Sequence, residues 1–291
     1  LHLRSSKLES TDWRSCKYLK LHLSLIFTSF LPSALCYLSL TSSLFPSLDF
    51  HCLHSIVSIY PRNISLNRVI IQPYPTTCFT MAGTVPIAHS LEDIYTPDAL
   101  PAQMERWDAL QEKFESIYGH APEFVARSPG RVNIIGEHID YSLYSVLPMA
   151  ITADTLLAVS TSLTPTKPGT FKIKIANVQE ARFPSHEFDI PFDTVEIDAT
   201  VHEWTNYFKS GLRGALELLR RKHGNDFRPK SMKILMDGTV PAGGGLSSSA
   251  AFVSASALAV MVANGEQAIN KKELTELAIV SERAVGVNSG G

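Results

Sequence analysis

The chain has 291 residues, of which 45% are hydrophobic, and its formal net charge at pH 7 is −2. Such a balanced charge excludes the basic surface with which most nucleic-acid-binding proteins hold a phosphate backbone, so the sequence predicts a small-molecule partner and no nucleic acid. All four cysteines precede Met81. The remainder of the chain therefore contains neither a disulfide nor a thiolate metal site.

Residues 1–80 differ from the rest of the chain, because they are rich in leucine and serine and poor in acidic residues. Residues 21–40 are apolar and long enough to span a bilayer, as a signal or anchor would be. This run contains Pro32 and four serines, and no clear small-residue cleavage site follows it. The alternatives are a leader upstream of a true start at Met81, a targeting segment, or another disordered extension. We favour the leader, expect no membrane partner, and place the folded domain in residues 81–291.

From Met81 onward, hydrophobic spacing and turn residues predict helices and strands in turn. A helix is expected from about Pro101 to Tyr118, because Trp107 lies on its apolar stripe and Gly119 suits its C-terminal cap. Trp107 is therefore expected in the core. The further expectations are a short strand at 124–128, strands at 146–162 and 171–177 that pair antiparallel, a helix at 203–223, a strand at 232–237, and helices at 250–263 and 270–285.

A run of glycines and a run of serines stand together in residues 241–251: Gly243, Gly244, Gly245, Ser247, Ser248 and Ser249. Glycine adopts positive φ without a Cβ clash, so successive backbone N–H groups can turn inward and hold an anion. The serines open an apolar helix, whose N-terminus attracts negative charge, and their hydroxyls are candidate Mg²⁺ ligands. A flexible linker is the alternative. The strand pattern before the loop and the apolar helix after it favour a phosphate-binding site.

A second group of polar residues, Glu137, His138 and Asp140, follows an apolar pair and a glycine. A loop at the end of buried structure presents such side chains as hydrogen-bonding groups, and carboxylates and imidazole suit the hydroxyls of a sugar. A metal site, which would want a further histidine or carboxylate nearby, and a solvated turn are the alternatives. The residues alone leave these interpretations open.

Both motifs resemble those of one known enzyme family. Residues 130–141 resemble the signature of galactokinases, and residues 241–251 resemble the phosphate loop of the wider GHMP small-molecule kinases. Their order and separation also match. Residues 203–207 resemble the family's tryptophan-containing helix start, and residues 285–291 resemble the segment just before its catalytic aspartate. The glycine-rich loop and the Asn-Ser-Gly-Gly ending are most similar to fungal galactokinases.

The resemblance implies an α+β fold, with a mixed sheet packed by helices, in which residues 81–291 form the N-terminal domain of a GHMP kinase and the C-terminal domain is missing. It implies that Arg131 is the catalytic arginine. Galactose would be held by Glu137, His138, Asp140 and Gly290.

The resemblance also implies which residues bind the nucleotide. The ATP phosphates would lie against Gly243, Gly244, Gly245, Leu246, Ser247, Ser248, Ser249 and Ala250. Ser248 or Ser249, together with Glu282, would bind Mg²⁺. Trp204 and Tyr207 would stand near the adenine, although their place on an apolar helix stripe makes a core role equally open.

The activity that the resemblance implies is ATP-dependent phosphorylation of galactose at C1 in the cytoplasm. The sequence has neither a Gly-Lys-Ser phosphate loop nor a His-Arg-Asp kinase loop, which excludes the two commonest other ATP-binding machineries. The alternatives are an N-acetylgalactosamine kinase and a galactose- and ATP-binding sensor that acts through a regulatory protein partner. The intact serine–alanine segment 247–251 favours the enzyme. Because the catalytic aspartate of the family is expected just after Gly291, the chain as written is expected to be inactive.

Overall fold

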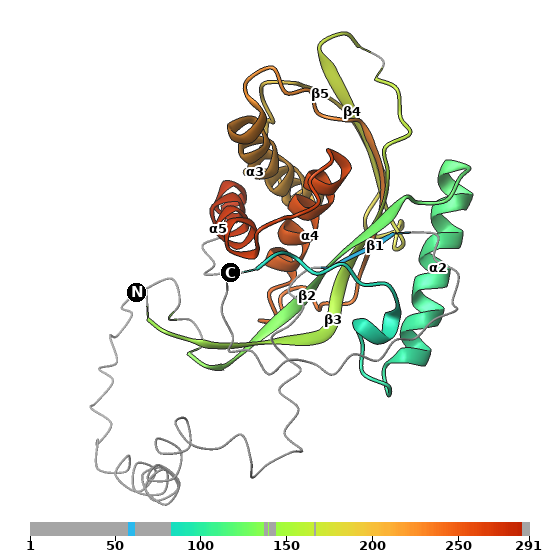
Figure 1. Ribbon diagram of the computed structural model, residues 1–291, viewed down its shortest axis with the longest axis vertical. Coiled ribbons are helices and arrows are strands. Elements are labelled where there is room, and N and C mark those ends of the chain that lie inside the picture. Colours follow the sequence, from blue (N-terminus) through green and yellow to red (C-terminus); the bar gives the residue numbers. More distant parts are fainter. Residues whose placement is uncertain (1–57, 62–82, 137–138, 140–143, 166, 287–291) are drawn as a thin grey trace, which may run out of the picture. The chain divides into compact units, whose positions relative to one another are not determined.

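A six-stranded mixed sheet lies at the centre of the fold (Figure 1). The computed structural model describes residues 58–61, 83–136, 139, 144–165 and 167–286. The strands, in the spatial order β1-β2-β3-β6-β4-β5, are β1 (Ser58–Pro61), β2 (Phe124–Ile135), β3 (Leu147–Ser160), β6 (Met232–Gly238), β4 (Thr170–Asn177) and β5 (His186–Pro191). Neighbouring strands are antiparallel except β4 and β6, which are parallel. The mixed sheet that the resemblance implied is confirmed.

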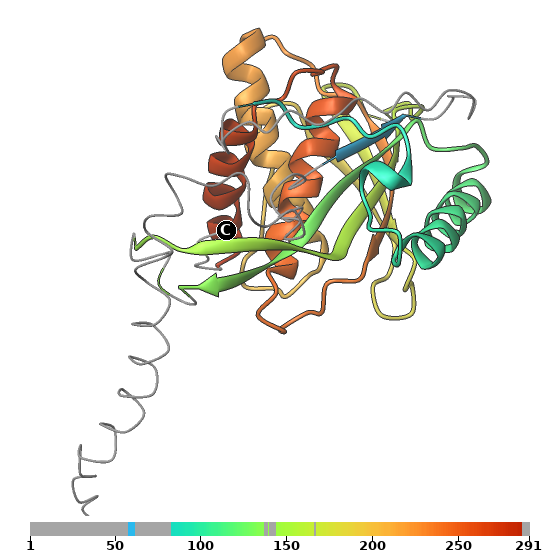
Figure 2. The same ribbon diagram turned by 60° about the horizontal axis from the view of Figure 1, so that its bottom comes forward.

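Helices cover both faces of this sheet. Figures 1 and 2 show α3 (Thr205–His223), α4 (Ser248–Ala263) and α5 (Lys271–Glu282) together on one face, and α2 (Leu100–Tyr118) on the other. The 3-10 helix η2 (Leu91–Asp93) precedes α2, and the 3-10 helix η4 (Arg283–Val285) follows α5. The larger hydrophobic core therefore lies under α3, α4 and α5, and a smaller one lies under α2.

The central strand β6 contributes to both cores. Ile234 belongs to the core under α3, α4 and α5, whereas Leu235 belongs to the core under α2, and neither is exposed. Successive side chains of a strand point to opposite faces, so a strand covered on both sides buries apolar residues at consecutive positions. Trp107 lies in the core under α2 with 2% of its surface exposed, which confirms the core role predicted for it.

The helix ends follow the local signals in the sequence. Gly119 caps α2 with a left-handed φ of 78°. Asn270 caps α5, because its side chain accepts hydrogen bonds from the backbone N–H groups of Lys272 and Glu273 at 2.9 and 3.2 Å. Side-chain caps of this kind satisfy N–H groups that have no partner within the helix. The helix α4 begins at Ser248 with Ser247 in the N-cap position, which confirms that the serines open this helix.

The predicted antiparallel pairing of strands 146–162 and 171–177 is wrong. β6 lies between β3 and β4, because the chain leaves β5 through the crossover helix α3 before it returns to the sheet. The prediction assumed that strands adjacent in sequence are adjacent in the sheet, which a parallel crossover connection breaks. β5 was not predicted.

The strand predicted at 124–128 continues as β2 to Ile135, through Pro129 and Gly130. The pairing of β2 with β3 shifts register between Pro129 and Arg131, because their partners Asp154 and Ala150 lie four positions apart in β3. Sheets accept proline at edges and at irregularities of the ladder, and the pairing of β2 with β1 extends to Arg127, two residues before Pro129. The strand therefore continues through Pro129 and Gly130, a dipeptide that usually ends a strand.

Residues 1–57 and 62–82 lie outside the described residues, and with them the apolar run 21–40. Within the first eighty residues the structure describes β1, a strand that the sequence did not lead us to expect and that pairs antiparallel with β2. Among the residues that the structure describes, no helix combines the length and the apolar character that crossing a membrane requires.

Candidate active site

The glycine-rich loop connects the end of β6 to the start of α4. Gly243 and Gly245 have φ angles of 72° and 70°, and Ser247, directly before the helix, has a φ of 59°. Left-handed residues of this kind turn backbone N–H groups inward, and the first turn of α4 presents further N–H groups that have no partner within the helix. The loop joins a strand and a helix within one compact unit, whereas a flexible linker would be expected between two units. Its geometry suits an anion such as a phosphate.

The strand β2 lies directly against this loop. The backbone N–H of Arg131 donates a hydrogen bond to the carbonyl oxygen of Leu246 at 3.0 Å. A Cβ atom at Gly130 would lie 2.9 Å from the same carbonyl oxygen and 3.0 Å from Cγ1 of Val240. Glycine is therefore required at position 130 for the close approach of strand and loop. The structure places the backbone of Arg131 against the glycine-rich loop, and the catalytic role of its side chain stays a prediction.

Two of the predicted Mg²⁺ ligands meet at the start of α4. The hydroxyl of Ser249 donates a hydrogen bond to Oε1 of Glu282, which is the last residue of α5 and is 1% exposed. The described part of the chain contains no cluster of three or more histidine, cysteine, aspartate or glutamate side chains that could hold a metal alone. Mg²⁺ is usually bound by one or two carboxylates together with phosphate oxygens and water. A carboxylate and hydroxyl pair beside the loop therefore fits an ion that arrives with a nucleotide.

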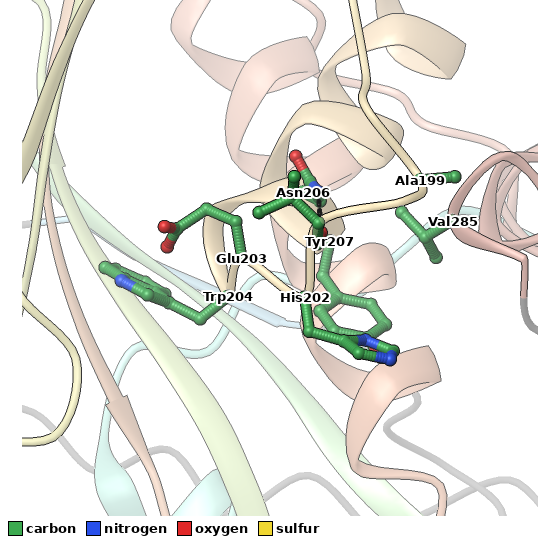
Figure 3. A pocket seen from close by; sticks show the side chains of 8 residues that line it. Ala199, His202, Glu203, Trp204, Asn206, Tyr207 and Val285 are labelled. Atoms are coloured by element: carbon green, nitrogen blue, oxygen red, sulfur yellow. Dashed lines mark hydrogen bonds between the residues drawn. The ribbon is translucent and has the colours of Figure 1, made fainter.

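A cavity of about 150 Å³ lies at the N-terminal end of α3, and its lining residues are Ala199, Val201, His202, Glu203, Trp204, Asn206, Tyr207 and Val285 (Figure 3). Asn206 holds one wall, because its side-chain amide donates to the carbonyl oxygens of Asp198 and Val201 at 2.8 and 2.9 Å. Val285 comes three residues after Glu282 in the chain. The cavity and the carboxylate of Glu282, which accepts from Ser249, thus involve residues of one short segment that includes η4.

Trp204 and Tyr207 both line the cavity and both pack against the larger core. The ring of Trp204 stacks on Phe252 with 6.0 Å between centroids, and its indole N–H donates to the carbonyl oxygen of Pro184 at 3.1 Å. Figure 3 shows the two side chains pointing in different directions from the start of α3. The core role that the sequence left open is thus present for both residues, and a cavity is present beside them.

A buried ion-pair cluster, which sequence reasoning missed, lies near the loop. Asp154 of β3 is fully buried and accepts hydrogen bonds from Nε of Arg127 at 2.5 Å, Nη1 of Arg106 at 2.6 Å and the hydroxyl of Tyr95 at 2.6 Å. Nε of Arg106 also lies 2.5 Å from Oδ2 of Asp237 in β6. Burial is the largest of the influences that raise the pKa of Tyr95 to about 12. The available signal was a charged residue within an apolar strand pattern, at positions 127 and 154.

The predicted galactose ligands Glu137, His138, Asp140 and Gly290 lie outside the described residues. The first three fall between the end of β2 and the start of β3, and Gly290 follows η4. The chain positions on either side are described: β2 ends at Ile135, and Gly136 has a left-handed φ of 101°. Their assignment stays a prediction.

Comparison with known proteins identifies the class to which this fold and loop belong. Residues 112–161 match the family model described as the galactokinase galactose-binding signature. Residues 206–291 match the model described as the GHMP kinases N terminal domain. The first range includes Arg131 and the second includes the whole glycine-rich loop. The class defined by the fold and the loop is that of the GHMP kinases.

Individual relatives narrow the class to one family. A galactokinase of Candida maltosa is 39% identical over 203 residues, which cover 69% of this chain and 90% of that protein. A galactokinase of Schizosaccharomyces pombe is 42% identical over 216 residues, which cover 72% of this chain and 40% of that protein. The crystal structure of Lactococcus lactis galactokinase complexed with galactose is similar with a TM-score of 0.51 and 28% identity, over 63% of this chain and 44% of that one. The chain belongs to the galactokinase family, and it spans 40% of the length of the S. pombe relative.

Proposed function

We propose that the protein phosphorylates galactose at C1 with ATP, as a cytoplasmic enzyme. The observation that carries this proposal is the hydrogen bond from the Arg131 N–H to the Leu246 carbonyl. It joins β2, which lies within the galactose-binding signature, to the loop that suits phosphate. A sugar held after β2 would therefore lie beside the phosphate that it receives.

Phosphoryl transfer needs positioning and charge stabilisation more than covalent chemistry. Backbone N–H groups of the loop and of the first turn of α4 would hold the phosphate oxygens of ATP. Arg131 would stabilise the negative charge that develops on the transferred group, and this stabilisation increases toward the transition state. Glu137, His138, Asp140 and Gly290 would hold the hydroxyls of galactose and fix its 1-hydroxyl toward the loop.

The remaining nucleotide contacts follow from the two neighbouring features. Ser248, Ser249 and Glu282 would hold Mg²⁺, which supplies positive charge to the phosphates when it is bound. The cavity at the start of α3, beside Trp204 and Tyr207, would receive the adenine, because it combines aromatic walls with a few polar groups. Glu282 and Val285 place these two sites on one short segment.

Ligand binding tests the two predicted sites separately. Calorimetric titration should show binding of ATP with Mg²⁺ and of galactose, with glucose, its C4 epimer, as the matched sugar control. Asp140→Ala should weaken galactose binding at least roughly 10-fold, because a hydrogen bond to a charged group contributes about 1.5–3 kcal/mol. It should leave ATP binding unchanged.

Ser249→Ala should have the opposite effect. It should weaken the affinity for ATP with Mg²⁺ and leave the affinity for galactose unchanged. Arg131→Ala should change the affinity for galactose little, since its contribution is made mainly as charge develops. Equal binding of glucose and galactose, or equal losses of both ligands in both variants, would contradict the proposal.

A further inference from the structure

The phosphate loop has little packing of its own. Residues 241–245 are all exposed, and the backbone hydrogen bond within this stretch runs from the Gly244 N–H to the Pro241 carbonyl at 3.3 Å. Ser247 adopts a left-handed conformation, which a residue with a side chain holds only when the surrounding structure requires it. The conformation of the loop therefore depends on how its two ends are held.

The far end of the loop is held by β2, through the bond between Arg131 and Leu246. The leading end is held by β3. The backbone N–H of Thr239 donates to the carbonyl oxygen of Asp154 at 2.9 Å, and the backbone N–H of Asp154 donates to the hydroxyl of Thr239 at 3.0 Å. The same hydroxyl lies 3.2 Å from the Asp154 carbonyl oxygen. Both backbone groups of Asp154 are thus engaged by the residue that starts the loop.

The side chain of Asp154 is also held in place by several partners. Its carboxylate is completely buried and receives Arg127 from β2, Arg106 from α2 and Tyr95 from the segment before α2. Arg106 also binds Asp237, which lies two residues before Thr239 in β6. Buried charges with several partners hold a fixed geometry, because movement of either partner would leave an uncompensated charge. One cluster thereby links α2, β2, β3 and β6 at the base of the loop.

We propose that Asp154 is a positioning residue for nucleotide binding: the buried cluster fixes its backbone, and its backbone, through Thr239, fixes the leading end of the phosphate loop. This inference rests on the proposed function, because it needs the loop to bind ATP. The simpler possibility is that the cluster only stabilises the fold. The two can be separated, because Thr239 connects the cluster to the loop without belonging to the cluster.

The test compares Thr239→Val, Thr239→Ser and the wild-type 291-residue chain. Thr239 is exposed, so valine keeps the shape and loses the hydroxyl without disturbing a core, whereas serine keeps the hydroxyl. Ser231→Ala is the matched control. Ser231 directly precedes β6, at the end opposite Thr239, and its buried hydroxyl accepts a hydrogen bond from the Lys172 N–H at 2.8 Å.

Hydrogen–deuterium exchange of residues 241–249 without ligand, and calorimetric affinity for ATP with Mg²⁺, are the measurements. Thr239→Val should speed loop exchange and weaken ATP binding by about 3- to 10-fold, which corresponds to the loss of one net hydrogen bond. Thr239→Ser should restore both. Ser231→Ala should lower the melting temperature and change neither. Asp154→Asn should act like Thr239→Val and more strongly, and the Thr239 pair decides the matter if that variant does not fold.

Several outcomes would overturn the inference while leaving the proposed function intact, provided that the wild-type chain binds ATP. These are unchanged exchange and affinity in Thr239→Val, a Thr239→Ser variant as impaired as the valine variant, or a Ser231→Ala variant with the same loss of affinity. A wild-type chain that binds no ATP with Mg²⁺ would overturn the inference and the proposed function together.

Discussion

Gly130→Ala should move the phosphate loop, because the added Cβ would meet the carbonyl oxygen of Leu246 at 2.9 Å and Cγ1 of Val240 at 3.0 Å. The first of these atoms belongs to the backbone and cannot rotate away. Adding a methyl group to a packed site of this kind usually costs about 1–3 kcal/mol. For a domain of this size that corresponds to a melting temperature roughly 2–12 °C lower. The clash also strains the bond between Leu246 and Arg131.

Gly238→Ala, at the end of β6, is the matched control. Its Cβ would lie 3.0 Å from Cε of Met236, the far end of a flexible side chain, and 3.8 Å from the hydroxyl of Thr155. Loss of unfolded-state freedom should stabilise this variant by up to about 1 kcal/mol. Thermal unfolding and titration with ATP and Mg²⁺ should therefore separate the two alanine variants. Equal melting temperatures and equal affinities in Gly130→Ala and Gly238→Ala would refute the reasoning.

Three further predictions concern stability. Phe114→Ala, at a completely buried site, should lower the free energy of unfolding in urea by about 3–5 kcal/mol, whereas alanine at the exposed Met104 should change it by less than about 0.5 kcal/mol. Asn270→Ala removes the cap of α5 and should cost about 0.5–2 kcal/mol in the same assay; an unchanged midpoint would show that the cap contributes nothing. Burial raises the pKa of Tyr95 to about 12, against about 10 in an unfolded chain, so the folded state keeps the proton between these values and stability should fall as pH rises from 10 to 12. Tyr95→Phe should make that fall less steep, and an identical slope would contradict the assignment.

Local signals predicted the helices well. In α2, the spacing of Trp107, Leu110 and Phe114 marks the buried stripe, and Gly119 marks the end. Asn270 marks the start of α5. Each of these signals acts within a few residues, so the sequence contains it directly. The register shift beside Pro129 and the position of β6 between β3 and β4 depend on contacts with distant strands, and no local pattern in the sequence predicts them.

The candidate site divides in the same way. The glycines and serines of the loop predict phosphate binding from their own conformational preferences, and the structure gives Gly243 and Gly245 the expected positive φ. The hydroxyl of Ser249 donates a hydrogen bond to Glu282, and the Mg²⁺ binding that the family resemblance implied for both residues stays a prediction. The cluster around Asp154 escaped prediction, since Arg106 and Asp237 come from positions 48 and 83 residues away from it in the sequence. Ion pairs between residues so far apart in the sequence follow no regular spacing, so they cannot be predicted from the sequence pattern.

The place of β6 in the sheet has a consequence for the order of folding. β2 pairs with β3, and β4 pairs with β5, each between segments close in the chain, and among the described strands β6 alone joins these two pairs. Contacts between distant segments form late, because the intervening chain must first close into a loop. The two hairpins can form before the ribosome has synthesised β6. The glycine-rich loop, which follows β6, can be anchored only after β6 has paired with β3 and β4. The proposed binding of ATP to the closed sheet would then favour the last step of folding by mass action.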